Sequence, residues 1–240
     1  MRQIRFYYFF SSSEKKIIIK DKEIIHQARN VLRLKKGDGV ILFNEKTEWR
    51  GRINLICKDF IEVFLEEEIG FLKEPKNYVR LFASILKREN FEILVQKATE
   101  IGIKEICPLI CQRTVKLNFK EERLKKIIKE AAEQSGRRSL AVLYPPFKFE
   151  DSLDFIDKND INLFFDLEGK KFQKILKNIP LKSKKINIFI GPEGGWSEEE
   201  KEKAKEKKFF IIKLSDLSFR SETAGIIASY LSVYFNEFFP

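Results

Sequence analysis

The sequence predicts an α/β fold in which a small β-barrel domain precedes a larger domain with a mainly parallel sheet. Over residues 1–70, short apolar runs follow one another closely and are separated by turn residues such as those at 36–39, which is typical of a small barrel. From Tyr78 onward, strand-like runs alternate with longer helical segments, as expected for a parallel sheet covered by helices. We therefore expect two domains, 1–70 and 71–240, joined at the proline-containing polar stretch 71–77.

One helix is expected among the strands of the first domain. Asp21 is placed to cap a segment that runs toward Leu32, and Arg29 and Arg33 flank its apolar stripe. The two arginines could offer a basic face to phosphate, or they could be solvated while Val31 and Leu32 pack in the core. The expected strands are residues 4–10, 15–19, 39–43, 49–56 and 60–65.

In the second domain, helices are expected at residues 91–101 and from 122 to about 136. The first has one apolar face and stops at Gly102. The second ends in Arg137 and Arg138, which could contact phosphate or complement the helix dipole. The expected strands are residues 79–86, 105–110, 140–143, 161–165, 186–190 and 209–214.

Composition limits the classes of function. Lys and Arg number 46 against 36 Asp and Glu, which gives a net charge of +10 and favours an anionic partner such as nucleic acid, or else a lysine-rich solvated surface. Three cysteines without a secretory leader predict a reducing, cytoplasmic environment. Cys107 and Cys111 are too few for a closed zinc site and are better interpreted as small buried residues, so no metal is expected. No apolar run reaches the ~20 residues that cross a bilayer.

The most informative segment is a glycine turn that follows the apolar run 186–190. Gly191, Gly194 and Gly195 allow the backbone to turn tightly and to lie against a bound molecule. Ser197 and Glu200 have the spacing of a capping box, which marks the start of a helix. The alternative is an ordinary strand-to-helix turn.

A second segment of the same kind favours the ligand site. The apolar run 209–214 also ends in a loop that opens a helix of small residues near 224, so two strand ends could face one pocket of an α/β sheet. The chain lacks a dinucleotide-binding glycine fingerprint and a Walker lysine, which argues against dinucleotides and nucleoside triphosphates at these loops.

Several ordered motifs together resemble the RsmE family, methyltransferases of the SPOUT class that modify a uridine imide nitrogen in small-subunit ribosomal RNA. The resemblance implies a PUA-like barrel, a deep trefoil knot in the C-terminal part of the α/β domain, S-adenosyl-L-methionine as cofactor and a homodimer. It also implies the small ribosomal subunit and its 16S rRNA as partners. The motifs are His-Gln-Ala-Arg-Asn-Val-Leu-Arg at 26–33, Lys87, Gln-Lys-Ala-Thr-Glu-Ile-Gly at 96–102, Pro108, Glu-Gln-Ser-Gly-Arg at 133–137, Gly-Pro-Glu-Gly-Gly at 191–195 and Arg-Ser-Glu-Thr-Ala at 220–224.

Two departures from the family pattern lie near the end of the chain. The family's usual Leu-Gly-Pro-Arg is Leu-Ser-Asp-Leu at 214–217, and its usual Arg-Thr-Glu-Thr is Arg-Ser-Glu-Thr at 220–223. The first change affects side-chain contacts expected from residues 215–217. If the loop binds its ligand through backbone groups, those contacts do not depend on the changed side chains.

The resemblance also implies roles for individual residues. A uracil imide loses its proton only well above neutral pH, so the site must accept that proton or stabilise the charge that develops. Arg220 is expected to stabilise negative charge on the uracil oxygens, or to clamp a phosphate. Glu222 is a candidate base, or else an ion-pair partner or helix-dipole complement.

The remaining site residues divide into two sets. Cofactor contacts are expected from Leu86, Phe165, Leu167, Glu168, Ile190, Gly191, Pro192, Glu193, Gly194, Gly195, Leu214, Leu217, Ser218, Phe219 and Thr223, and RNA contacts from Arg29, Arg33, Lys87, Arg113, Arg137 and Arg138. Rival interpretations are methylation of transfer RNA or of another ribosomal site, a non-catalytic ribosome assembly factor, and a phosphate-binding hydrolase built on the glycine turn.

Overall fold

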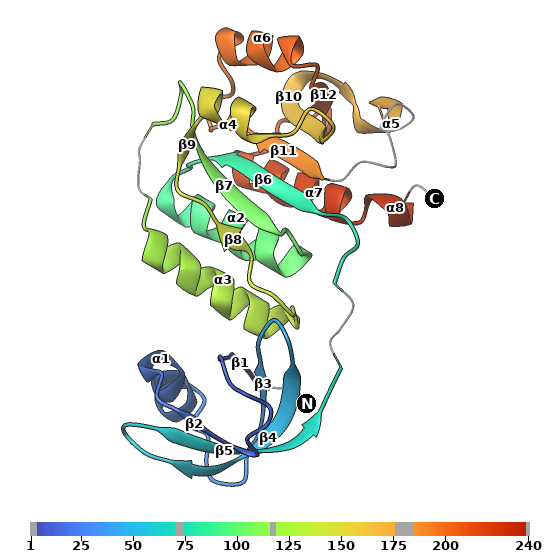
Figure 1. Cartoon of the computed structure of the whole chain (residues 1–240). Helices are drawn as coiled ribbons and strands as arrows, with labels where there is room; N and C mark the ends of the chain where they lie inside the picture. The colour runs from blue at the N-terminus through green and yellow to red at the C-terminus, as the bar shows by residue number, and fades with distance from the viewer. Residues whose placement is uncertain (1–3, 71–73, 116–118, 176–184, 239–240) are drawn as a thin grey trace. The chain divides into compact units, whose positions relative to one another are not determined.

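The computed structural model describes residues 4–70, 74–115, 119–175 and 185–238, and the chain divides into two units (Figure 1). The first unit contains the chain up to Glu74 together with residues 132–139, and the second contains the rest. The division after Glu74 falls in the stretch where the sequence places the linker. The segment 132–139, which the sequence assigns to the second domain, groups with the first unit.

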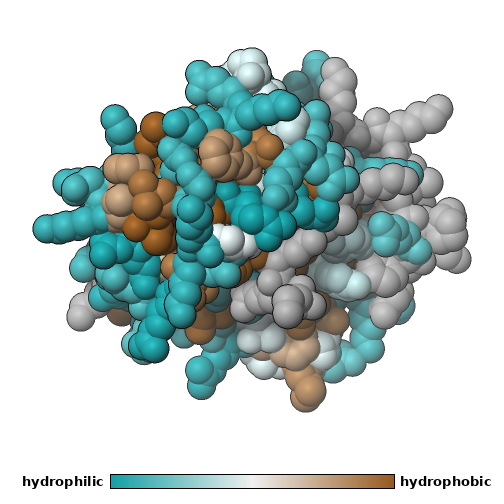
Figure 2. All heavy atoms as spheres, turned by 90° about the horizontal axis from the view of Figure 1, so that it is seen from below, coloured by the Kyte–Doolittle hydropathy of each residue, from teal (hydrophilic) through white to brown (hydrophobic). Residues whose placement is uncertain are grey.

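The first unit contains a five-stranded sheet in the order β1-β3-β4-β5-β2. Its strands pair antiparallel, except that β1 runs parallel to β3. Apolar residues from these strands enclose one core, while Phe9, Ile18, Leu55 and Phe64 remain exposed; Figure 2 shows apolar side chains among the charged ones on one face. The strands are β1 (Arg5–Tyr7), β2 (Lys16–Ile19), β3 (Gly39–Phe43), β4 (Glu48–Ile56) and β5 (Ile61–Glu68).

The predicted helix of this unit is present but irregular. The Asp21 side chain accepts hydrogen bonds from the backbone N–H groups of Glu23 and Ile24, which confirms the predicted cap of α1 (Lys22–His26). A π-helical turn, η1 (Gln27–Val31), follows directly, and Arg33 then has a left-handed backbone with φ of 52°. Such π turns are rare and frequently occur at functional sites.

Residues 132–139 are held in the first unit by buried polar contacts. The Arg5 guanidinium forms a 3.0 Å ion pair with Glu48 and donates to the backbone carbonyls of Ala132 at 3.2 Å and Arg137 at 3.1 Å. The Tyr7 N–H donates to Glu133 Oε1 at 2.9 Å. Because these groups are out of water, the contacts fix the segment to the barrel strands.

The second unit contains a parallel sheet in the order β12-β10-β11-β6-β7-β8, with β9 paired to β7. Every strand pair in it is parallel among the described residues, which confirms the predicted α/β class. The strands are β6 (Val79–Ser84), β7 (Glu105–Ile110), β8 (Val142–Leu143), β9 (Phe147–Lys148), β10 (Ile161–Lys171), β11 (Ile186–Ile190) and β12 (Phe210–Lys213), and the helices are α2 (Arg88–Ile101), α3 (Glu121–Ser135), α4 (Phe149–Phe155), α5 (Phe172–Ile175), α6 (Glu198–Glu206), α7 (Ser221–Val233) and α8 (Phe235–Phe238).

Continuous apolar strands allow this sheet to be covered on both faces. Side chains alternate across the sheet, so Leu81 and Ile188 lie in one core with residues of α2 and α7, while Phe82 and Phe189 lie in another with residues of α4 and α6. Figure 1 shows α2 and α7 on one side of the sheet and α4 and α6 on the other. Phe82 and Phe189 stack with ring centroids 4.6 Å apart.

Local signals predict where several elements end. Helix α2 ends at Gly102, whose φ of 114° favours glycine, as predicted. The observed bounds of β3, β7 and β11 coincide with the predicted ones. Strand β10 is the main difference, because it continues to Lys171 after an irregularity between Phe165 and Lys170.

The parallel arrangement positions the candidate site. Strands β6, β10, β11 and β12 point the same way, so their carboxyl ends meet at one edge of the sheet, where ligands of open α/β sheets bind. The predicted loops after residues 165, 190 and 214 all lie at this edge. Among the described residues, no helix is both long and apolar enough to cross a bilayer.

Candidate functional site

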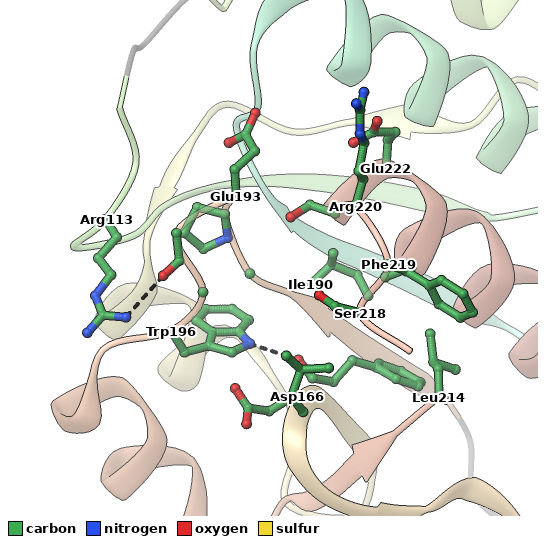
Figure 3. Close-up of a pocket in the computed structure, with 18 of the residues that line it drawn as sticks. Arg113, Asp166, Ile190, Glu193, Trp196, Leu214, Ser218, Phe219, Arg220 and Glu222 are labelled. Carbon is green, nitrogen blue, oxygen red and sulfur yellow. Dashed lines mark hydrogen bonds between the residues drawn. The ribbon is translucent and has the colours of Figure 1, made fainter. Parts of the chain in front are cut away.

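A cavity of about 880 Å³ opens at this edge of the second unit, a size in the range of small-molecule sites. Figure 3 shows its walls: the segment after β11 with Trp196, the irregular part of β10 with Asp166, and the segment after β12 that leads to Arg220 and Glu222. It is lined by Lys87, Asn90, Arg113, Phe165, Asp166, Leu167, Glu168, Ile190, Gly191, Pro192, Glu193, Gly194, Gly195, Trp196, Lys201, Ile212, Leu214, Ser215, Leu217, Ser218, Phe219, Arg220, Ser221, Glu222 and Ala224.

The glycine turn, residues 191–195, forms one wall of the cavity. Its tight backbone depends on positions that have no side chain. A Cβ on Gly191 would lie 3.0 Å from the Trp196 ring, and Gly195 has φ of 70°, which favours glycine. The Gly195 N–H donates to the Pro192 carbonyl at 2.9 Å, and Arg113 donates to the Gly194 carbonyl at 3.0 Å. The predicted ligand-facing turn is therefore held from within and from the loop after β7.

Trp196 supports the floor of the cavity. Its indole N–H donates to the Phe165 carbonyl at 3.0 Å, and its ring stacks on Phe164 with centroids 4.3 Å apart. The side chain is 2% exposed, and a buried indole N–H requires a partner of this kind. The hydrogen bond joins the loop after β11 to the end of the regular part of β10, a link that sequence reasoning did not find.

The capping box predicted after the glycine turn is present. The Glu200 N–H donates to Ser197 Oγ at 3.2 Å, and the Ser197 N–H donates to Glu200 Oε2 at 2.8 Å, which defines the start of α6. Glu200 Oε1 also accepts from the Gln112 N–H at 2.9 Å. One buried carboxylate thus fixes both α6 and the loop after β7.

The irregular part of β10, residues 166–169, forms the second wall. Phe165 and Lys170 both pair with Ile212, so the residues between them leave the ladder, and Asp166, Leu167 and Glu168 line the cavity. A Cβ on Gly169 would lie only 2.5 Å from the Ile212 backbone, a distance that real Cβ atoms do not reach. Glycine is therefore required where this bulge passes β12.

The segment after β12 carries the departures from the family pattern. Ser215 Oγ accepts from the Leu217 N–H at 3.0 Å. Asp216 contacts Lys171 at 2.7 Å and Lys213 at 2.9 Å. The hydrogen bonds from these lysines, that from Lys171 first, lower the pKa of Asp216 to about 2. The departing residues thus tether this loop to the end of β10.

Arg220 and Glu222 lie at one end of the cavity (Figure 3). Arg220 is exposed and precedes α7, whereas Glu222, in the first turn of α7, is 8% exposed. Its Oε2 atom is buried and has no hydrogen-bond partner among the described residues. No ion pair joins the two residues in the part of the chain that the structure describes, so the alternative role of Glu222 as a partner of Arg220 is not seen.

Glu193 connects the glycine turn to the start of α2. Its Oε1 accepts from the Lys87 N–H at 3.1 Å. Lys87 is the N-cap residue of α2 and provides no side-chain cap of its own, so Glu193 satisfies a donor at that helix start from another loop. The glycine turn and α2 are thereby fixed together.

Most of the expected cofactor contacts come together in this cavity. All of them line it except Leu86, which is 1% exposed in the apolar core, and Thr223, which is exposed on α7. Sequence reasoning did not assign Asn90, Trp196 and Lys201 to the site, although they line it. Trp196 follows the glycine pair directly, and that adjacency was the available signal.

The expected RNA contacts are divided. Lys87 and Arg113 are exposed beside the cavity, and Arg29 and Arg33 are exposed in the first unit. Arg137 is different: it is 6% exposed, and its guanidinium pairs with Glu74 at 3.3 Å. Burial in that ion pair takes Arg137 out of reach of a phosphate, which corrects the expectation for this residue.

Arg138 is exposed, and its Nε donates to the Glu45 carbonyl at 2.9 Å. The cysteines near the sheet are structural: Cys107 and Cys111 are buried, as predicted. Burial raises the pKa of the Cys111 thiol to about 12. No group of three or more His, Cys, Asp and Glu residues able to hold a metal occurs in the described part of the chain.

Comparison with known proteins agrees with this geometry. Residues 73–232 match the RNA methyltransferase domain family, and residues 19–66 match the RNA methyltransferase PUA domain family. The first match covers more than half of the chain. The first unit therefore includes a PUA domain, as the resemblance implied.

Individual relatives are similar over nearly their whole length. Ribosomal RNA small subunit methyltransferase E of Rickettsia conorii is 34% identical over 218 residues, covering 89% of this chain and 87% of the relative. Ribosomal RNA small subunit methyltransferase E 2 of Borreliella burgdorferi is 31% identical over 227 residues, covering 91% and 90%. The crystal structure of the Neisseria gonorrhoeae enzyme of the same name, bound to S-adenosyl methionine, superposes with a TM-score of 0.86 at 26% identity and covers 95% of each chain. These matches confirm the RsmE resemblance, and the chain belongs to the ribosomal RNA small subunit methyltransferase E family.

Proposed function

We propose that this protein transfers a methyl group from S-adenosyl-L-methionine to the N3 imide nitrogen of a uridine in 16S ribosomal RNA of the small subunit. The cavity carries the proposal, because apolar surface and a few charged groups converge there on a space of the size that a small molecule needs. The relatives named for ribosomal RNA methylation, and the neighbour that binds S-adenosyl methionine, support it.

The residues present fit this cofactor. Backbone of the glycine turn can approach a ligand closely because Gly191 and Gly195 have no Cβ. Ile190, Leu214 and Phe219 supply apolar surface for an adenine ring. When bound, the cofactor supplies an electrophilic methyl group, and the protein supplies placement.

The groups around this end of the cavity are suited to activating a uracil. Arg220 is exposed and forms no ion pair among the described residues, so its guanidinium is available to stabilise negative charge on the uracil oxygens. Glu222 lines the cavity together with Arg220, and its carboxylate is our candidate to accept the imide proton. We assign it this role in addition to its position in the first turn of α7.

Arg220→Ala tests the assignment. We expect rRNA methylation to fall about 10²- to 10³-fold, the cost of removing one charge-stabilising donor, while calorimetry shows nearly unchanged cofactor affinity. Arg88→Ala is the matched control, because Arg88 pairs with Glu92 at 3.0 Å and does not line the cavity. A parallel loss of cofactor affinity in Arg220→Ala would instead make Arg220 a cofactor or folding residue.

The substrate itself is tested with radiolabelled cofactor. Small subunits that lack the modification, naked 16S rRNA and transfer RNA are offered separately, and the product is mapped by primer extension, which an N3 methyl group on the pairing edge arrests. Methylation of subunits or their rRNA, and not of transfer RNA, supports the proposal. Intact RNA binding without any transfer would favour a non-catalytic assembly factor.

We propose that the first domain, residues 1–70, binds the RNA through the exposed Arg29 and Arg33. The Arg29→Glu, Arg33→Glu double variant should weaken RNA binding and lower its salt dependence, whereas Lys58→Glu, an exposed residue elsewhere in this unit, should change binding less. Lys87, Arg113 and Arg220 add exposed positive charge beside the cavity. If the two variants weakened RNA binding equally, Arg29 and Arg33 would not be part of the surface that binds RNA.

We propose that the second domain, residues 71–240, contains the deep trefoil knot of its class, formed where the segments after β10, β11 and β12 meet. The family membership supports this, as does the placement of β10 and β11 between β12 and β6 in the sheet. Stretching the chain by its ends with optical tweezers tests it. A tightened knot makes the extended length fall short of about 3.3–3.6 Å per residue, and a full-length extension would exclude a knot.

We propose a cytoplasmic homodimer. Ile93 on α2 and Tyr230 on α7 are about half exposed, and these two helices pack against each other, so their outer face offers apolar surface for a second copy. Light scattering should give twice the monomer mass. The Ile93→Glu, Tyr230→Glu variant should give the monomer mass, and a dimer that persists would place the interface elsewhere; cell fractionation tests the location.

A further inference from the structure

Lys201 is a nearly buried cation in the wall of the cavity. It lies on α6, and its side chain is 11% exposed. Its Nζ contacts Glu168 Oε1 at 3.0 Å and Glu198 Oε1 at 3.1 Å. Both carboxylates are themselves mostly exposed, at 70% and 75%. The lysine is therefore much less exposed than the two acids that it contacts.

One donor of this lysine is unused. A protonated amine carries three N–H donors, and the two carboxylates accept two of them. Among the residues that the structure describes, Nζ has no further partner. Lys201 lines the cavity, so a molecule bound there can supply an acceptor for this donor.

The lysine keeps its charge at neutral pH. The hydrogen bond to Glu168 is the main cause that raises the pKa of Lys201, and burial opposes it. The third N–H is therefore present whenever the site is in use.

We propose that Lys201 binds the methyl donor directly, by donating its third N–H to an uncharged acceptor atom of the adenosine part. This inference rests on the proposed function, because it requires that ligand in the cavity. The charges nearby decide the type of acceptor. Asp166, Glu168 and Glu198 place three negative charges around one positive charge, so a further carboxylate would be repelled. A ribose hydroxyl or a ring nitrogen carries no negative charge and would not be repelled.

The helix provides a matched control. Lys203 also lies on α6, and its Nζ also contacts two carboxylates, Glu150 at 3.0 Å and Glu199 at 2.8 Å. It does not line the cavity. Lys201→Met and Lys203→Met therefore remove the same charge and the same number of ion pairs from one helix, and only the first removes a donor from the cavity.

The test measures dissociation constants by calorimetry for S-adenosyl-L-methionine, S-adenosylhomocysteine and 5′-methylthioadenosine, which shares the adenosine part and lacks the amino acid. Lys201→Met should raise all three about tenfold or more, the range for a hydrogen bond to a charged group. Lys203→Met should raise them less than about twofold. Glu198→Gln should raise the three constants less than Lys201→Met, because Glu168 still holds the lysine and Glu198 does not line the cavity.

Several results would overturn the inference. Equal dissociation constants for the two lysine variants would show that Lys201 does not contact the ligand. Equal losses of affinity for Lys201→Met and Glu198→Gln would mean that the lysine acts only through its ion pairs. A loss for the full donor without one for 5′-methylthioadenosine would place the contact at the amino acid part. Failure of the wild-type protein to bind any of the three ligands is a different result, because it refutes the proposed function itself.

Discussion

Replacing Glu222 by glutamine should separate its role in stability from its role in chemistry. Its Oε2 is buried without a partner, and such a group costs about 1–3 kcal/mol. Because Glu222 lies in the first turn of α7, the helix dipole stabilises its negative charge by about 0.3–1 kcal/mol. Removing the charge while keeping the shape should therefore raise the free energy of unfolding by about 1 kcal/mol, or the melting temperature by about 2–4 °C.

The same substitution should slow the reaction. If Glu222 accepts the imide proton, single-turnover methylation of rRNA should fall about 10²- to 10⁴-fold, with cofactor affinity unchanged. Urea unfolding is followed by the fluorescence of Trp196 in a Trp49→Phe background, so that the signal reports the unit that holds Glu222. A variant that is less stable and methylates at the wild-type rate would refute both steps of the reasoning.

Three further predictions concern the walls of the cavity and its surroundings. Gly169→Ala should raise the dissociation constant for S-adenosylhomocysteine in calorimetry, because its Cβ would lie 2.5 Å from the backbone of Ile212; unchanged affinity would show that the bulge is not a binding wall. Cys57 should react with a thiol reagent at pH 8 well before Cys111, which is buried and has a pKa of about 12; equal rates in the native protein would contradict this. Asp216 has a lowered pKa of about 2, so its stabilisation is complete above the unfolded value near pH 4 and is lost only as the pH falls through about 2. Thermal scans from pH 5 to 8 should therefore show the same effect of Asp216→Asn at each pH, and a varying effect would be inconsistent with that pKa.

Much of the fold follows from signals that are local in sequence. The bounds of β7 and β11 coincide with the predicted strands, because apolar runs there end at turn residues. Gly102 and the Ser197 and Glu200 capping box act within one helical turn, so residues a few positions apart are enough to predict them. The positions of the loops that line the cavity were predictable for the same reason.

Other parts of the site depend on residues far apart in sequence. Lys201 lies in a run of glutamates and lysines that is typical of a solvated helix, and its burial arises from contact with Glu168, 33 positions away. The bulge of β10 depends on Gly169 passing the backbone of β12. The sequence places Arg137 at the basic end of a helix, yet its guanidinium is buried with Glu74, 63 positions earlier. Periodicity and spacing hold no information on such pairs.

The departure at residues 214–217 is explained by the same kind of distant contact. A glycine and an arginine of the family pattern are absent there, and the chain instead has Asp216 between Lys171 and Lys213, at 2.7 and 2.9 Å. Lys171 ends β10, whose bulge forms another wall of the cavity. Asp216, Lys171 and Lys213 thus join two cavity walls that come from separate parts of the sequence. A loop with altered side chains can therefore keep its backbone in place for the ligand.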